Sequence, residues 1–150
     1  YQHRISFLRL ADAICMAMPI GLGLVRIGNF LNGELYGRPT DGTWGFIFPT
    51  DPYGFTRHPS QLYEAIFEGF FLFILLLFIG AKNNKHGVIS GSFLLAYGLI
   101  RFFIEYFRQP DSHMGFVALQ LSMGQLLSIP MVIIGLILLT KSLRRNEAIS

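Results

Sequence analysis

The sequence predicts an all-α, polytopic integral membrane protein: a bundle of about four transmembrane helices with an ordered outward loop near residues 33–61. Three observations predict this fold class. Apolar residues make up 52% of the 150 residues, charged residues only 14%, and the mean hydropathy is +0.48. Four stretches approach the roughly 20 apolar residues that a helix needs to cross the hydrocarbon core. Ionisable residues lie mainly between those stretches, with a few inside them.

The same composition excludes several classes of protein. Too little of the chain is polar for it to remain solvated and disordered, and Cys15, its single cysteine, cannot form an intrachain disulfide. Basic residues are scattered among apolar runs, so the net charge of +3 does not predict a nucleic-acid partner. No histidine pair has ligand spacing and no nucleotide-binding glycine loop occurs, so neither a metal nor a cofactor is expected.

The predicted transmembrane helices are, in chain order, 10–31, 62–81, 88–107 and 123–140. The second contains the run FFLFILLLFI and the fourth is nearly free of charge, so these two are the clearest. The first holds Pro19 and several glycines, which favour tight packing and a break near its end. Arg26 and Arg101 lie within the first and third, where a charge costs about 2.5 kcal/mol or more, so both are candidates for function.

Basic residues between the helices predict the orientation. One side carries seven of them, namely Arg4, Arg9, Lys82, Lys85, Lys141, Arg144 and Arg145. The other side carries three, namely Arg38, Arg57 and Arg108. The positive-inside rule therefore places both ends of the chain in the cytoplasm and directs loops 33–61 and 109–121 outward.

The long loop 33–61 combines four prolines with six aromatic residues. Aromatic rings of this kind favour the boundary between water and lipid. We interpret the loop as a folded cap on the membrane face. An interfacial anchor with no part in chemistry is the alternative interpretation.

The segment YGLIRFFIEYFR, residues 97–108, carries a polar helix face. Tyr97, Arg101, Glu105 and Arg108 follow one another at intervals of four, four and three, which places them on one side of a helix. Arg101 and Glu105 can pair, which reduces the cost of holding either charge in the membrane. The group is either a structural ion pair with one snorkelling arginine or part of a ligand site.

A second polar group lies in RIGNFLNGELYG, residues 26–37, where the first predicted helix opens into the loop. This segment holds more polar side chains than packing explains, namely Arg26, Asn29, Asn32 and Glu34. Gly37 permits a close approach of another backbone segment. The alternative is a helix terminus that satisfies its own carbonyls. Arginines from two helices at the outer membrane depth predict a cradle for an anionic headgroup, because guanidinium groups match phosphate oxygens.

A third group is RHPSQLYEAIFE, residues 57–68. Gln61, Glu64 and Glu68 fall on one face of the predicted helix, where the carboxylates face a polar cavity or the headgroups. His58 is a candidate proton carrier because imidazole titrates near neutral pH. A histidine in an outward loop is more often a hydrogen-bonding or packing residue.

These segments resemble, in the same order, those of the bacterial phosphatidylglycerol:prolipoprotein diacylglyceryl transferases. The matching stretches are RIGNFLNGELYGR at 26–38, RHPSQLYE at 57–64, YGLIRFFIEYFRQPD at 97–111 and SMGQLLSIPM at 122–131. The resemblance implies a multi-pass enzyme of the bacterial inner membrane, with its site facing outward. It would transfer the diacylglyceryl group of phosphatidylglycerol to the lipobox cysteine thiol of a prolipoprotein, releasing glycerol phosphate.

The resemblance also implies roles for individual residues. Arg26 and Arg101 would hold the lipid phosphate, where an arginine pair neutralises the charge that grows on the leaving group. Glu34 and Glu105 would orient the arginines. The other residues that it implies are Asn29 and Tyr97 in the lipid site, with Asn32, Gly37 and Arg108 in support.

Members of that family have further transmembrane helices ahead of the matched region, including a histidine followed by two glycines that is thought necessary for activity. Nothing in residues 1–12 corresponds to it, so we interpret the chain as the C-terminal portion of the enzyme. The thiol nucleophile would belong to the substrate, not to Cys15, and the candidate bases in this chain are His58, Tyr97, Glu34 and Glu105. A non-catalytic module that binds anionic phospholipid and an inactive remnant are the alternatives.

Overall fold

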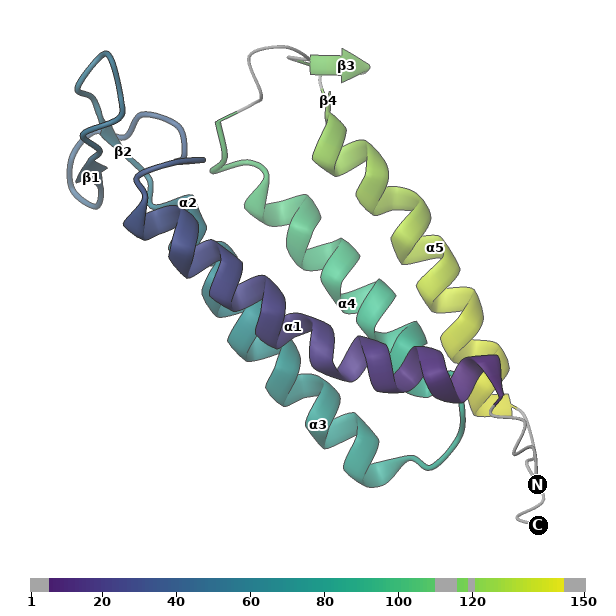
Figure 1. Cartoon of the computed structure of the whole chain (residues 1–150). Helices are drawn as coiled ribbons and strands as arrows, with labels where there is room; N and C mark the ends of the chain where they lie inside the picture. Colours follow the sequence, from purple (N-terminus) through teal and green to yellow (C-terminus); the bar gives the residue numbers. More distant parts are fainter. Residues whose placement is uncertain (1–5, 110–115, 119–120, 145–150) are drawn as a thin grey trace.

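The computed structural model describes residues 6–109, 116–118 and 121–144. Its helical segments are α1 (Phe7–Leu31), α2 (Ser60–Glu64), the π-helix η1 (Ala65–Phe71), α3 (Leu72–Lys82), α4 (Val88–Ile104) and α5 (Met123–Arg144). Its strands are β1 (Phe46–Ile47), β2 (Thr56–Arg57), β3 (Phe116–Ala118) and β4 (Leu121–Ser122). Figure 1 shows the helices as a bundle with the strands at one end and the first turn of α1 and the last of α5 at the other.

The predicted helical membrane bundle is confirmed, but the bounds of all four helices differ from the predicted ones. The first begins at Phe7 instead of residue 10, the second extends from Ser60 to Lys82, and the last continues to Arg144. Within the part of the chain that the structure describes, three segments are long and apolar enough to span a membrane: α1 with 25 residues, the continuous α2–η1–α3 segment with 23, and α5 with 22. The fourth helix, α4, has 17 residues and ends at Ile104 instead of residue 107. Its length lies at the lower limit of spanning helices.

The prediction that Pro19 and the glycines break the first helix near its end is wrong. Helix α1 continues through Pro19 to Leu31 and ends where Gly33 takes a φ of +69°. Only a residue without a Cβ adopts that left-handed conformation without strain. Gly23 of α1 has a packing role instead, because a Cβ on Gly69 of η1 would lie 2.7 Å from the Cα of Gly23. The backbones of α1 and η1 are therefore in direct contact, as small residues allow in membrane bundles.

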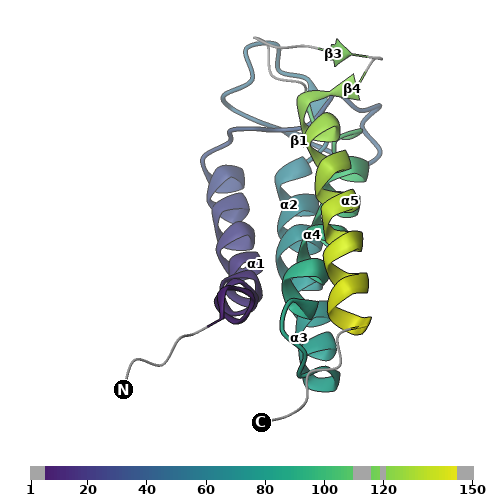
Figure 2. The same ribbon diagram turned by 90° about the vertical axis from the view of Figure 1, so that its right-hand side faces the viewer.

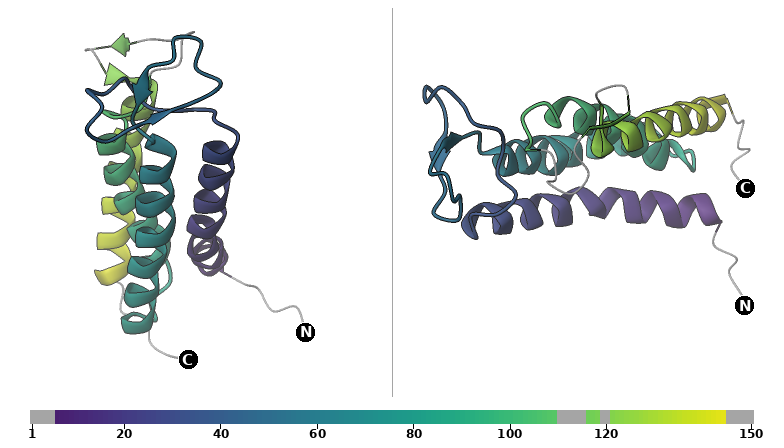
Figure 3. Two further views of the ribbon diagram at one scale, coloured as in Figure 1. Left: turned by 90° about the vertical axis from the view of Figure 1, so that its left-hand side faces the viewer. Right: turned by 90° about the horizontal axis from the view of Figure 1, so that it is seen from above.

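Helices α4 and α5 lie side by side, and α1 runs along the α2–η1–α3 segment (Figures 2 and 3). A buried carboxylate ties α1 to α4 at the end away from the strands. Asp12 accepts hydrogen bonds from the backbone N–H groups of Gly87 at 2.6 Å and Ser90 at 2.8 Å, and from the Ser90 hydroxyl at 2.8 Å. These contacts cap the N-terminus of α4, where the helix dipole favours a negative charge.

An ordered loop at residues 33–59, called the cap below, lies at one end of the bundle. The loop was predicted to continue to residue 61, but α2 already begins at Ser60. Strands β1 and β2 pair antiparallel, with Phe46 opposite Arg57 and Ile47 opposite Thr56. The guanidinium of Arg57, a residue of β2, donates from Nε to Asp51 Oδ2 at 2.6 Å and from Nη2 to Asp51 Oδ1 at 3.0 Å. The same guanidinium lies 4.8 Å from the ring centre of Tyr36. A bidentate pair over an aromatic ring holds the cap in one conformation.

This pair predicts an acid-sensitive cap. The Arg57 guanidinium and the N–H groups of Tyr53 and Phe55 lower the pKa of Asp51 below its ordinary value. The stabilisation is therefore complete above the unfolded-state pKa of about 3.9 and is lost as the pH falls through the lower folded-state value. Fluorescence of Trp44, the single tryptophan, should stay constant from pH 7 to about pH 4 and change below that value.

The matched control is Asp51→Asn, which removes the titrating carboxyl. Asp41, whose pKa is also lowered by Thr43, remains in the variant, so the comparison isolates Asp51. The acid transition of Trp44 should disappear in Asp51→Asn. An unchanged transition would contradict the assignment of acid sensitivity to this pair.

Candidate functional site

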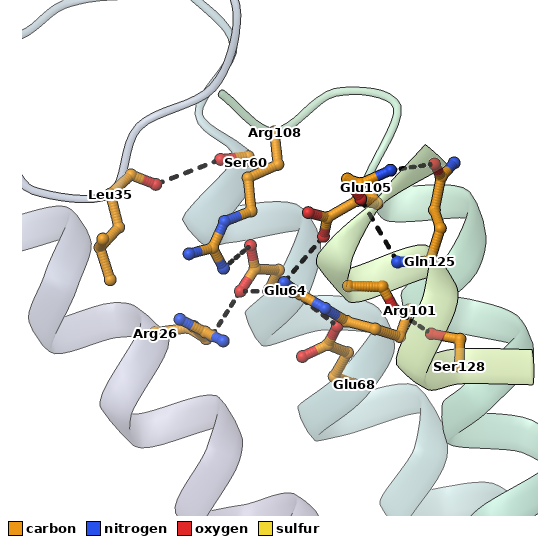
Figure 4. Close-up of polar contacts among 12 residues, drawn as sticks. Arg26, Leu35, Ser60, Glu64, Glu68, Arg101, Glu105, Arg108, Gln125 and Ser128 are labelled. Atoms are coloured by element: carbon orange, nitrogen blue, oxygen red, sulfur yellow. Dashed lines mark hydrogen bonds and ion pairs between the residues drawn. The ribbon is translucent and has the colours of Figure 1, made fainter. Parts of the chain in front are cut away.

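A buried cluster of arginines and glutamates connects α1, the α2–η1 segment and the end of α4. Figure 4 shows three arginine side chains that point toward Glu64 from two sides. Glu64 is 1% exposed, Glu68 is fully buried and Glu105 is 7% exposed. The cluster lies at the end of the bundle that carries the cap, within or next to the apolar spans.

Glu64 is the centre of this cluster. Its Oε2 forms an ion pair with Nε of Arg26 from α1, and the same oxygen lies 3.4 Å from Nη1 of Arg101 on α4. Its other oxygen, Oε1, lies 3.7 Å from Nη1 of Arg108. Two arginines that are 75 positions apart in the sequence therefore contact one carboxylate oxygen.

Arg101 contacts two further carboxylates. Its Nη2 lies 2.8 Å from Glu105 Oε2, the pairing that the spacing of four predicted. Its Nη1 lies 3.4 Å from Glu68 Oε1, and Glu68 belongs to the π-helix η1. Buried charges are tolerated only when paired, and the partners also hold the guanidinium in one orientation.

Glycines make room for the cluster at two points. The contact between Gly23 and Gly69 brings α1 close to η1, and Arg26 follows Gly23 by about one helical turn. At the start of α5, a Cβ on Gly124 would lie 2.6 Å from Glu105 Oε2. Any larger residue at this position would displace Glu105 from Arg101.

The other residues predicted between 26 and 37 lie at the boundary between α1 and the cap. Asn29 is half-buried, and its carbonyl accepts the N–H of Glu34 at 3.0 Å. Asn32 ends α1 and donates from Nδ2 to Glu34 Oε1 at 3.4 Å, with both residues exposed. Glu34 was expected to orient an arginine, but Glu64 and Glu68 contact Arg26 and Arg101 instead. Glu34 does not reach the arginines because it lies beyond the end of α1, whereas Glu64 and Glu68 lie inside an apolar span.

Tyr97, Gly37 and His58 have separate surroundings. Tyr97 precedes Arg101 by one turn and stacks on Phe93 with ring centres 5.5 Å apart. Gly37 lies against backbone, since a Cβ there would be 2.5 Å from the Phe107 carbonyl oxygen. His58 Nδ1 is 3.2 Å from the Tyr63 hydroxyl, and its ring lies edge-on to Phe107 at 5.5 Å. These contacts support a packing role for His58 at the junction of cap and α4.

Glu64 and Glu68 were not among the predicted site residues. The available signal was their position, because both interrupt an apolar span on the same helix face as Gln61. Their partners could not be predicted, because Arg26 and Arg101 lie on other helices and nothing in the spacing relates those helices.

The fold and this cluster define a class of protein: a polytopic helical membrane protein with a polar site at membrane depth, where buried ionisable residues mark function by default. Comparison with known proteins assigns the chain within this class. The chain belongs to the prolipoprotein diacylglyceryl transferase family, whose sequence model matches residues 1–141.

Curated relatives agree with this assignment. A phosphatidylglycerol–prolipoprotein diacylglyceryl transferase of Geobacter sulfurreducens is 51% identical over 145 residues, which cover 97% of this chain and 55% of the relative. The protein of the same name from Chlorobaculum tepidum is 49% identical over 145 residues, covering 97% and 50%. That of Aliivibrio fischeri is 48% identical over 146 residues, covering 97% and 52%. The chain thus spans about half the length of the curated relatives it matches.

Proposed function

We propose that this chain carries the phosphatidylglycerol site of a diacylglyceryl transferase, which moves the diacylglyceryl group to the lipobox cysteine thiol of a prolipoprotein. The observation that carries the proposal is the convergence of Arg26 and Arg101 on one oxygen of Glu64. Two guanidinium groups that reach one carboxylate oxygen also reach the oxygens of one phosphate. The name of the family and the names of its curated relatives support the same activity.

Each guanidinium has five N–H donors, so an arginine that holds a carboxylate retains donors for a second anion. Arg26 is suited to this task, because its side chain is still 16% exposed. Arg101 is held by Glu64, Glu68 and Glu105, which position its guanidinium before a lipid arrives. Preorganised donors of this kind stabilise charge without reorganisation during the reaction.

In the proposed reaction, the thiolate sulfur of the acceptor cysteine attacks the carbon of the diacylglyceryl group that is bonded to the phosphate oxygen. The carbon–oxygen bond breaks as the carbon–sulfur bond forms, and the electron pair leaves with the phosphate of glycerol phosphate. Arg26 and Arg101 stabilise the negative charge on that leaving group. The thiol proton passes to a base, and thiolate formation near neutral pH is favoured by the positive field of the arginines.

The proposed location is the bacterial inner membrane, with both ends of the chain in the cytoplasm and the cap and site facing outward. Basic residues support this orientation, because Lys82, Lys85, Lys141 and Arg144 lie at the end of the bundle opposite to the cap. Arg4 and Arg145, which are predicted on the same side, lie outside the described residues. In this orientation the site faces the outer side of the membrane, where an exported prolipoprotein can reach it.

A module that binds anionic phospholipid without catalysing transfer is the second candidate. This candidate is favoured by the length of the match, because the chain matches only about half of each curated relative. The residues that activate the thiol in the longer proteins can then lie outside the matched half. Both candidates share the lipid site and differ in whether this chain alone carries out the transfer.

A transfer assay tests the proposal. The 150-residue chain is placed in phosphatidylglycerol vesicles with a lipobox peptide, and the mass of the peptide is measured. A diacylglyceryl increment on the cysteine that disappears in Arg101→Ala is the expected result. A folded chain that binds phosphatidylglycerol and gives no increment would instead favour the non-catalytic module. A folded chain that does not bind the lipid would contradict both candidates.

A further inference from the structure

Next to the cluster, Gln61 holds a buried acceptor oxygen that no donor among the described residues uses. Gln61 of α2 is 1% exposed and precedes Glu64 by one helical turn. Its Nε2 donates to the backbone carbonyl of Glu34 at 2.7 Å. Its Oε1 is buried and has no hydrogen-bond partner within the described part of the chain.

The orientation of this amide follows from its partner. A backbone carbonyl oxygen only accepts hydrogen bonds, so the atom of Gln61 that faces Glu34 must be the nitrogen. Oε1 is then the atom left without a donor. Unsatisfied acceptors are rare in folded interiors, because an unmade hydrogen bond there is unfavourable. A donor from outside the described residues, such as a hydroxyl of a bound ligand, would satisfy Oε1.

The position of Gln61 along the bundle, relative to the arginine cluster, indicates which part of a bound lipid would supply this donor. Gln61 and Glu64 are three residues apart, so they share a helix face, with Gln61 nearer the cap. A lipid whose phosphate contacts the arginines beside Glu64 extends its acyl chains into the apolar bundle region, away from the cap. Its headgroup extends the opposite way, toward the level of Gln61. The unpaired Oε2 of Glu68 lies one turn deeper than Glu64, on the side of the acyl chains.

We propose, on the basis of the proposed function, that Gln61 is a specificity-determining residue whose Oε1 accepts a hydrogen bond from a free hydroxyl of the glycerol headgroup. The headgroup of phosphatidylglycerol carries two hydroxyl donors, and a headgroup of equal length without hydroxyls leaves Oε1 unpaired. The bond to Glu34 holds the Gln61 amide in place, so that the acceptor is oriented before the lipid binds. Gln61 thereby selects a hydroxylated headgroup, while the arginines bind any phosphate.

The test compares two lipids on the detergent-solubilised chain. Dioctanoyl phosphatidylglycerol and dioctanoyl phosphatidylpropanol share acyl chains, phosphate and a three-carbon headgroup, and only the first has free hydroxyls. Isothermal titration should give about tenfold tighter binding of the glycerol lipid to the wild-type chain. In Gln61→Met the preference should disappear, because affinity for the glycerol lipid falls to that of the propanol lipid. Gln61→Asn, whose amide is one methylene shorter, should lose most of the preference as well.

The matched control is Gln125→Met. Gln125 is also a buried glutamine, but its Oε1 accepts the Ser122 N–H at 3.1 Å. This variant should lose thermal stability and keep the tenfold preference. Equal binding of both lipids by the wild-type chain would overturn the role of Gln61 and leave the proposed phosphate site intact. A preference that survives in both Gln61 variants would overturn it too, and a wild-type chain that binds neither lipid would overturn the proposed function with it.

Discussion

Arg101→Ala should lower the affinity of the chain for dioctanoyl phosphatidylglycerol by about 30-fold or more, because a charge-assisted bond to the phosphate contributes on the order of 2 kcal/mol. Arg26→Ala should have a similar effect. The double variant should lose less than the sum of the two free energies, since both arginines contact one phosphate and their contributions are coupled. Titration calorimetry of the detergent-solubilised variants measures all three affinities.

Two further variants sharpen this experiment. Arg101→Lys keeps the charge but not the planar fork that contacts three carboxylates, so it should recover only a small part of the affinity. Arg9→Ala removes an exposed arginine at the opposite end of α1 and should bind like the wild-type chain. Undiminished lipid binding in Arg101→Ala and Arg26→Ala would refute the shared phosphate site.

Glu64→Ala should destabilise the folded chain by about 3–5 kcal/mol, because it removes the buried carboxylate that Arg26, Arg101 and Arg108 share. The vacated space between Arg26 and Arg101 then suits an inorganic anion. Phosphate should therefore raise the thermal midpoint of Glu64→Ala more than that of the wild-type chain. Thermal unfolding in detergent, with and without phosphate, measures both effects.

The control for this variant is Glu34→Ala, which removes an exposed carboxylate. Its effect on unfolding should remain within about 0.5 kcal/mol. A Glu64→Ala protein as stable as Glu34→Ala would show that Glu64 does not balance the arginines. Equal stabilisation of Glu64→Ala and the wild-type chain by phosphate would show that the convergence of Arg26 and Arg101 does not create an anion site.

The effects expected at Arg101 and Glu64 both depend on the packing of α1 against η1. The direct contact between Gly23 and Gly69 sets how near Arg26 comes to Glu64. The π-helical turn of η1 contributes as well, since it changes the direction of Glu68 relative to a regular helix. Substitution of either glycine would therefore move an arginine without removing a charge.

Several features of this protein were determined by its sequence. Apolar stretches of spanning length predicted the helical membrane bundle, because hydrocarbon requires every backbone group to be paired within a helix. Spacing along one helix predicted the pair of Arg101 and Glu105, since residues four apart lie on one face. Residue types alone marked Arg26 and Arg101 for function, because a charge at membrane depth is rarely kept without one.

Other features were decided only by the tertiary structure. Glu64 became the common partner of Arg26, Arg101 and Arg108, and Glu34 remained at the surface of the cap. Gln61 is buried, and its Oε1 has no hydrogen-bond partner among the described residues. The physical reason is that periodicity specifies which residues share a face of one helix and says nothing about which face meets a second helix. That choice depends on close backbone packing between helices far apart in the chain, which no local spacing encodes.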